Sequence, residues 1–190
     1  MKAKFIFCIF LALLFSSCIF YSFKGSLPAH IHSISLAPVM NESTEFSVAE
    51  IFNDELNSLM VGEHVLRIAM PDQADSQLEV IITSVTDRPY TISLSNELGM
   101  EEVEEWRLTI FTTVTWYDIK RDEILLEKQM NSWGVYAPGV DISTDNLDND
   151  GDNLIDSEDS DEVGSPRESA MNISIRRLTE DIVSEITNTW

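Results

Sequence analysis

Strict alternation of apolar and polar residues marks residues 105–119, the longest such segment of the chain. A period of two is typical of a strand with one face in a core and the other in solvent. Threonine and arginine occupy the polar face, where Phe111 is the exception. The apolar face consists of Trp106, Leu108, Ile110, Val114 and Trp116. The pattern therefore predicts a long, half-buried strand.

Shorter strands are predicted on both sides of it. They cover residues 30–39, 64–70, 77–85 and 124–136. In the third of these, Leu78, Val80 and Ile82 share one face, and a polar turn at 120–123 predicts a hairpin into the last strand. The polar residues 87–102 predict a mobile break before the long strand.

Helical spacing of apolar residues predicts two helices. In residues 47–62 the apolar positions are Val48, Ile51, Phe52, Leu56, Leu59 and Met60. Ser47 and Glu50 predict a capping box at the start of this helix, and Gly62 predicts its C-terminal cap.

The final helix is predicted over 165–190. Ser165 and Glu168 form a capping box around Pro166, which suits the first helical position. Its apolar stripe consists of Met171, Ile175, Leu178, Ile182, Ile186 and Trp190. The order β-α-β-β-β-β-α predicts an α+β fold, a two-layer sandwich in which two helices pack on one face of a four- to five-stranded mixed sheet.

Composition supports one folded domain, because 44% of the 190 residues are hydrophobic. The chain carries 33 acidic and 12 basic residues, a formal charge of −21. This excess argues against nucleic acid as a partner and against docking to an anionic membrane through a basic patch.

The N-terminus has the features of an export signal. Two lysines precede an unbroken apolar run over 5–15, which is too short to span a bilayer as a helix. Two serines then directly precede Cys18, an arrangement that resembles the bacterial lipobox. We predict a lipoprotein signal peptide over 1–17, lipidation of Cys18 and a tether over 18–29. The alternative is an ordinary cleaved signal with an incidental cysteine.

Acylation of Cys18 predicts a firm membrane anchor, because each buried methylene contributes about 0.8 kcal/mol. Ile19 follows the cysteine, where an aspartate would signal retention in the inner membrane, so the expected address is the outer membrane. Cys8 is lost with the signal, and the mature chain then has no thiol available for a disulfide.

An acidic segment at 141–164 separates the last strand from the last helix, where the fold needs only a connection. Residues 141–162 include ten acidic and no basic residues. Carboxylates at positions 1, 3, 5, 9 and 12 of a calcium-like loop are Asp148, Asp150, Asp152, Asp156 and Asp159, and Leu154 at position 7 would offer its carbonyl. We predict a calcium-binding insertion.

This loop departs from a complete EF-hand. Asn153 stands where glycine is usual, Asp159 replaces the longer glutamate, and no flanking helix pair is evident. It is more similar to the isolated aspartate-rich loops of extracellular repeats. The alternative is a solvated acidic linker.

Enzyme chemistry has little support in the sequence. His30, His32 and His64 lie in or beside predicted strands, and no third ligand accompanies the possible metal pair formed by the first two. The chain has no glycine-rich phosphate loop, no GxSxG motif and no available cysteine nucleophile. We therefore predict a protein that is not an enzyme.

Several segments resemble the lipopolysaccharide-assembly lipoprotein family, LptE. They are CIFYSFKGSLPAHIHSISLAPVMNES, FNDELNSLM, ITSVTDRPY, EEWRLTIFTTVTWYD and RLTEDIVSEITNTW. The resemblance covers the mature chain except for about 141–164. It implies a single two-layer domain over 30–190, interrupted by that insertion, on the periplasmic side of the outer membrane.

The resemblance also implies a partner and a role. Family members plug a large outer-membrane β-barrel of the LptD type, support its assembly and help deliver lipopolysaccharide to the outer leaflet. Basic and aromatic residues on or near strand ends are the candidates for contacts with the barrel or with lipopolysaccharide. They are Arg88, Tyr90, Arg107, Lys120 and Arg121.

Two other functions remain open from the sequence. The chain could be a calcium-binding surface or periplasmic lipoprotein whose loop acts as an interaction module, or a periplasmic enzyme subunit with unrecognised chemistry. Co-purification of a barrel separates the first of these from the export role.

Overall fold

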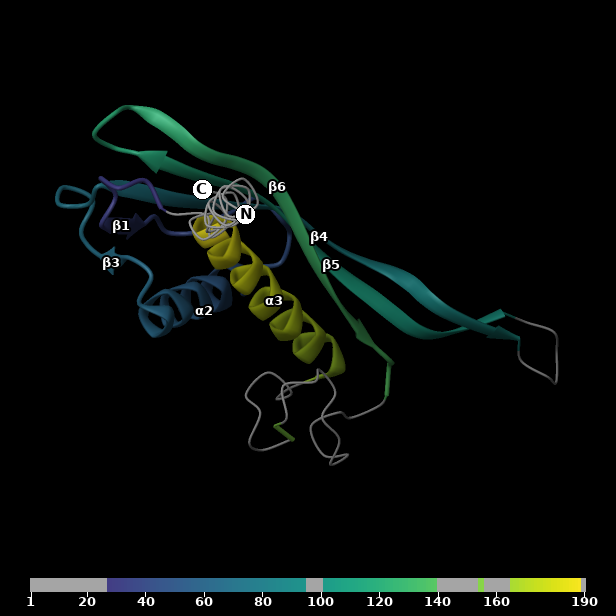
Figure 1. The fold of residues 1–190 in the computed structure, drawn as a ribbon. Helices are drawn as coiled ribbons and strands as arrows, with labels where there is room; N and C mark the ends of the chain where they lie inside the picture. Colours follow the sequence, from purple (N-terminus) through teal and green to yellow (C-terminus); the bar gives the residue numbers. More distant parts are fainter. Residues whose placement is uncertain (1–26, 95–100, 140–153, 156–164, 189–190) are drawn as a thin grey trace, which may run out of the picture.

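The computed structural model describes residues 27–94, 101–139, 154–155 and 165–188 (Figure 1). The predicted signal peptide, Cys18 and the carboxylates of the acidic insertion lie outside these residues. The final predicted core position, Trp190, lies outside them as well.

The described chain forms one mixed sheet and two helices, as predicted. The strands are β1 (Ser33–Leu36), β2 (Met40–Asn41), β3 (Arg67–Ile68), β4 (Ser76–Leu94), β5 (Glu101–Asp118) and β6 (Glu123–Tyr136). Their order in the sheet is β3-β1-β4-β5-β6, with β2 beside β4. The pairings of β1 with β3 and β4 are parallel, as is that of β2 with β4, whereas β4, β5 and β6 form an antiparallel meander.

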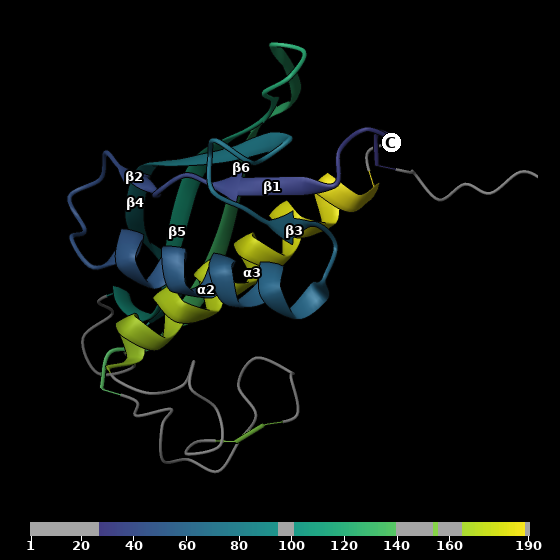
Figure 2. The ribbon, with the colours of Figure 1, turned by 90° about the vertical axis from the view of Figure 1, so that its left-hand side faces the viewer.

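Helices α2 (Val48–Glu63) and α3 (Pro166–Asn188) cover the same face of the sheet (Figures 1 and 2). Helix α3 packs across β5 and β6, and α2 packs beside α3. The core between the layers contains the predicted alternating residues of β4 and β5 together with the apolar stripes of both helices. Trp116, Phe52, Ile175 and Ile182 are fully buried there. The α+β fold class is therefore confirmed.

The capping predictions for the two helices have opposite outcomes. In α3, the backbone N–H of Ser165 donates to Glu168 Oε2 at 2.8 Å, and the N–H of Glu168 donates to Ser165 Oγ at 3.4 Å, which confirms the capping box. In α2 the capping box is wrong, because Ser47 has helical angles (φ −78°, ψ −20°) and its side chain makes no cap hydrogen bond. An N-cap residue needs an extended backbone to direct its hydroxyl at the first free N–H groups.

The C-terminal cap of α2 is also different from the prediction. The helix continues through Gly62 to Glu63, and His64 takes the left-handed conformation with φ 52°. The His64 ring nitrogen Nδ1 lies 2.7 Å from the carbonyl oxygen of Gly62. Histidine is among the residues that tolerate this region best, and the ring satisfies one of the carbonyls left free at the helix end.

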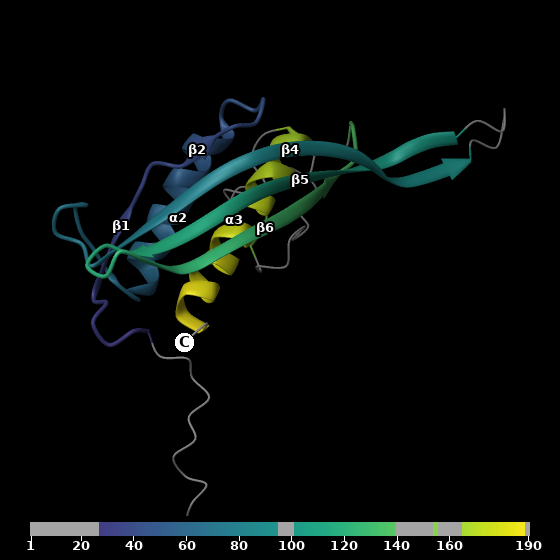
Figure 3. The ribbon, with the colours of Figure 1, turned by 90° about the horizontal axis from the view of Figure 1, so that it is seen from above.

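The break predicted over 87–102 is wrong for the residues that the structure describes there. Strand β4 continues to Leu94 and β5 begins at Glu101, so the two form a hairpin that extends beyond the helices (Figures 1 and 3). Register shifts flank Tyr90 and Thr91, where β-bulges absorb the irregular sequence. The segment predicted at 64–70 is shorter than expected, since β3 has only two residues.

Strand β6 approaches α3 closely at Gly134. A Cβ atom on this residue would lie 2.9 Å from the Cα and the carbonyl carbon of Ala170 and still closer to its oxygen. Glycine therefore lets the strand backbone rest directly on the helix backbone.

Among the described residues, no helix is both long enough and apolar enough to cross a membrane.

Candidate functional site

The side of β4, β5 and β6 that faces away from the helices forms an open face of the sheet (Figure 3). On β5 it carries Arg107, Thr109, Phe111 and Thr113, which alternate with the buried residues of the same strand. No described helix covers this side (Figures 1 and 2). Phe111 is 37% exposed and Trp133 on β6 is 40% exposed. The open face therefore offers aromatic contacts to solvent.

Three side chains from three adjacent strands meet on the open face, and we call them the Arg107 cluster: Tyr90, Arg107 and Trp133. The guanidinium carbon of Arg107 lies 5.5 Å from the centroid of the Tyr90 ring and 5.6 Å from that of Trp133. The ring centroids of Tyr90 and Trp133 are 6.0 Å apart. Each cation–π contact at an exposed site is worth about 0.5–1 kcal/mol, so the rings hold the guanidinium in place.

Two hollows adjoin this cluster. One of about 590 Å³ lies over the middle of β4, β5 and β6, and one of about 240 Å³ lies toward Arg107 and Trp133. They share Thr86, Arg88, Phe111 and Asn131, so they form one continuous groove. The groove is lined mainly by hydroxyl and amide side chains. Among the described residues that line it, the two charged ones are arginines and none is acidic.

The structure brings together three of the five residues predicted as contacts. Arg88 and Arg107 are direct cross-strand partners on β4 and β5, and Tyr90 stacks on Arg107. Tyr90 lies within strand β4, not in the break predicted over 87–102. Lys120 and Arg121 lie at the opposite end of β5, about 40 Å away at the usual rise per residue.

Lys120 and Arg121 form ion pairs that stabilise the fold. Lys120 Nζ pairs with Asp75 Oδ1, and Arg121 Nε lies 4.0 Å from Asp118 Oδ2. Asp118 Oδ1 accepts hydrogen bonds from the backbone N–H groups of Lys120 at 2.9 Å and Arg121 at 3.1 Å, and Asp118 Oδ2 also lies 2.5 Å from His30 Nε2. These contacts join the start of β1 to the β5–β6 turn.

The electrostatics of this network fit a structural role. Burial by itself raises the pKa of Asp118, but the His30 contact and the two backbone N–H donors outweigh burial and hold that pKa below its usual value. The hydrogen bond from Lys120 holds the pKa of Asp75 far below its usual value, with further donors at His32 and Ser33. Lys120 and Arg121 are thus engaged within the domain.

A second ion cluster lies where the hairpin leaves the helices. Arg167 Nη2 contacts Glu45 Oε2 at 2.6 Å and Asp87 Oδ2 at 3.0 Å. The Tyr136 hydroxyl donates to Asp87 Oδ1 at 2.9 Å. The hydrogen bond to Glu45 raises the pKa of Arg167 well above its usual value. No pattern in the sequence predicted this cluster, which joins the start of α3 to the base of the extended hairpin.

Trp133 was not among the predicted contact residues either, although the sequence contains one signal for it. Trp133 stands on the polar side of the alternation in 124–136, as Phe111 does in the long strand. A large aromatic residue on a solvent face is a mark of a contact surface. The register of β4, β5 and β6 brings these aromatics together.

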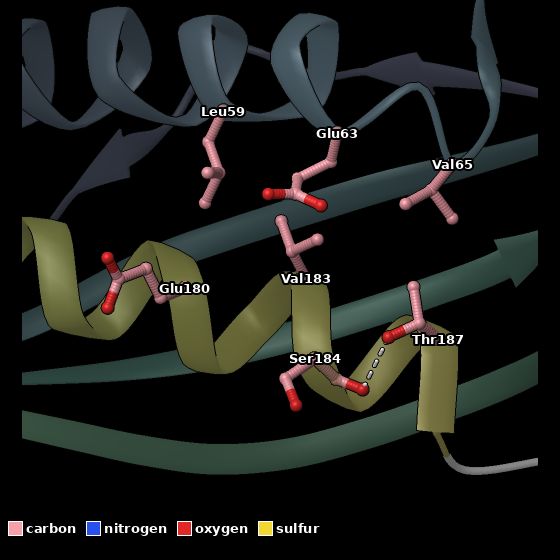
Figure 4. A pocket seen from close by; sticks show the side chains of 7 residues that line it. All are labelled: Leu59, Glu63, Val65, Glu180, Val183, Ser184 and Thr187. Carbon is pink, nitrogen blue, oxygen red and sulfur yellow. Dashed lines mark hydrogen bonds between the residues drawn. The ribbon is translucent and has the colours of Figure 1, made fainter.

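A further hollow of about 240 Å³ lies between the ends of α2 and α3 (Figure 4). Leu59, Val65 and Val183 form its apolar part, and Glu63 and Glu180 supply carboxylates. It contains none of the residues predicted as contacts.

The calcium prediction falls almost entirely outside the described residues. Of the six predicted ligands only Leu154 is described, and its side chain is 41% exposed. Within the described part of the chain, no three His, Cys, Asp or Glu side chains are grouped so that they could hold a metal ion.

Comparison with known families decides the relationship. The model of the lipopolysaccharide-assembly family LptE matches residues 31–189, which is nearly the whole described fold. The chain belongs to the LptE family. No curated protein matches it.

Solved structures that are similar to this LptE-family chain have low sequence identity to it. The hypothetical protein CT253 from Chlamydia trachomatis has a TM-score of 0.55 at 12% identity, over 83% of this chain and 96% of its own. A minor lipoprotein from Acinetobacter baumannii has a TM-score of 0.45 at 14% identity, over 84% and 94%. Protein XCC0632 from Xanthomonas campestris has a TM-score of 0.49 at 9% identity, over 86% and 91%. The CT253 structure supports the fold of this chain and says nothing about its role.

LptE membership gives the general role. The chain is a lipopolysaccharide-assembly protein of the Gram-negative envelope, and the family is one of assembly proteins, not of enzymes.

Proposed function

We propose that this LptE-family chain is the lipoprotein partner of an outer-membrane lipopolysaccharide-export β-barrel of the LptD type. It plugs the barrel, supports its assembly and aids delivery of lipopolysaccharide to the outer leaflet, without catalysing a reaction. The observation that carries this proposal is the family match across residues 31–189, which spans both layers of the fold. An anchor at Cys18 holds the domain on the periplasmic side of the outer membrane.

The geometry of the domain supports such a role. The helices close one side of the sheet, while the open face presents hydroxyl, amide and aromatic side chains. The interior wall of a large outer-membrane barrel is polar, so a plug must offer hydrogen-bonding groups to it. Lys120 and Arg121 pair with carboxylates of the domain itself, and the apolar core is buried between the sheet and the helices. The open face is therefore the surface that we expect to contact the barrel.

Affinity purification from detergent-solubilised outer membrane tests the proposal. A stoichiometric β-barrel partner is the expected result. Recovery of the chain without a barrel, together with tight calcium binding, would instead favour a calcium-binding interaction module.

Calcium binding by the acidic insertion is a separate prediction. Six carboxylates lie within Asp148–Asp159, five of them at the predicted ligand positions. They repel one another, and a bound cation would offset that repulsion. We expect weak affinity, roughly 10⁻⁴ to 10⁻³ M as in extracellular modules. Titration calorimetry should show a saturable heat with the wild type and none with the Asp148→Ala, Asp152→Ala double variant. Absence of saturable heat from the wild type at millimolar calcium would make the insertion an acidic linker.

A further inference from the structure

We propose that the groove beside Arg88 and Arg107 on the open face is the docking site for a carboxylate-bearing loop of the barrel partner. This inference rests on the proposed function and adds to it the surface that is used and the chemistry of the segment that binds there.

The first observation is the charge of the groove. The chain has 33 acidic residues, yet none of the described residues that line the groove is acidic, and the two charged ones are both arginines. In the described part of the chain, neither Arg88 nor Arg107 forms an ion pair with a carboxylate. Glu105 lies on the same face, but it accepts a hydrogen bond from Thr91. The groove is thus a small cationic site on a strongly acidic molecule.

The second observation is the register of the two arginines. Arg88 and Arg107 are direct partners in the β4–β5 ladder. Like charges directly opposite each other destabilise a sheet, so this pair has an electrostatic cost in the free protein. An anion between the two guanidinium groups would remove that cost and form charge-assisted hydrogen bonds with both.

The Arg107 cluster prepares this site for binding. The Tyr90 and Trp133 rings lie 5.5 Å and 5.6 Å from the guanidinium carbon of Arg107. The two ring centroids are only 6.0 Å apart, so both rings lie on the same side of the guanidinium group. Its other side and its N–H donors can still bind a carboxylate. Because the side chain is already held, less entropy is lost on binding than for a free arginine. Tyrosine, tryptophan and arginine are also the residues most often found at the energetic centre of interfaces.

The remaining lining favours a polypeptide over a lipid. Thr86, Thr109, Gln129 and Asn131 offer hydroxyl and amide groups that match a peptide backbone. Phe111 and Trp133 are the two large exposed apolar side chains among the described residues that line the groove, whereas several acyl chains would need a broad apolar surface. A loop with one carboxylate and one neighbouring apolar side chain fits both features.

Photo-cross-linking within the intact complex tests this surface. A photoreactive phenylalanine analogue replaces Phe111 in one variant and Val61 in a second. Val61 lies on α2, is 59% exposed and serves as the control. We expect Phe111 to cross-link to the barrel at least several-fold more than Val61, and the cross-linked peptide to contain Asp or Glu. Equal yields at both positions, or a cross-link from Phe111 to lipopolysaccharide, would overturn the inference.

Charge reversal at Arg107 is a second, independent test of the groove. Arg107→Glu should reduce the barrel retained on affinity purification by about tenfold or more, because it places a carboxylate opposite the partner's own. Arg67→Glu on β3 makes the same charge change away from the groove and should retain the barrel as the wild type does. Equal retention by both variants would count against the groove. If the wild type itself retains no barrel, the proposed function is wrong, and not only the assignment of the groove as the docking site.

Discussion

Replacement of Gly134 by alanine should destabilise the domain by about 3 kcal/mol, the upper end of the usual cost of overpacking. The new Cβ would lie 2.9 Å from two backbone atoms of Ala170, and neither strand β6 nor helix α3 can rotate a side chain away to relieve the clash. For a domain of this size, the midpoint of thermal unfolding should fall by about 6–12 °C. Thermal melts followed by circular dichroism measure this shift.

Gly62→Ala is the matched control for that experiment. Gly62 lies within helix α2, and a Cβ there would have no heavy atom within 4 Å. Alanine in a helix is favoured over glycine by up to about 1 kcal/mol, so this variant should melt at the same temperature or slightly higher. A Gly134→Ala protein that melts like the wild type would contradict the close packing of β6 on α3.

Loss of the anchor should follow from Cys18→Ala. A single acyl chain binds membranes only marginally, with K of roughly 10⁴ M⁻¹, whereas two or more chains anchor a protein stably. Metabolic labelling with a fatty-acid probe should therefore mark the wild type strongly and the Cys18→Ala variant not at all.

Cys8→Ala is the control for the labelling, because Cys8 lies within the predicted signal peptide. This variant should be labelled as the wild type is. Equal labelling of the wild type and Cys18→Ala would show that the chain is not acylated at this position.

Much of the fold could be predicted because burial on one side leaves a regular pattern. The alternation around Leu108 and Ile110 predicted β5, and both residues are fully buried. The extended hairpin was missed because it projects beyond the helices, where no core imposes alternation. There Asp87, Arg88 and Pro89 look like a loop, but pairing with β5 keeps them in a strand.

The residues of the candidate site could also be predicted only in part. Arg88, Tyr90 and Arg107 could be nominated from residue type and position, and the structure places them together. Their contact with Trp133 depends on the register of three strands and on the bulge beside Tyr90, which no local pattern encodes.

Two nominated residues proved to have other partners. Lys120 is paired with Asp75, which is distant in sequence, and Arg121 adjoins the buried Asp118. Residue type alone does not distinguish a cation that is free to contact a partner from one that holds the fold together.

Depletion of this chain in its own cells tests most directly whether it supports assembly of the export barrel. The measured quantity is the amount of correctly folded lipopolysaccharide-export barrel in the outer membrane, followed by its heat-modifiable migration on gels, alongside the lipopolysaccharide at the cell surface. We expect both quantities to fall as the chain is depleted and to recover when it is restored. Unchanged levels of folded barrel and of surface lipopolysaccharide would contradict it.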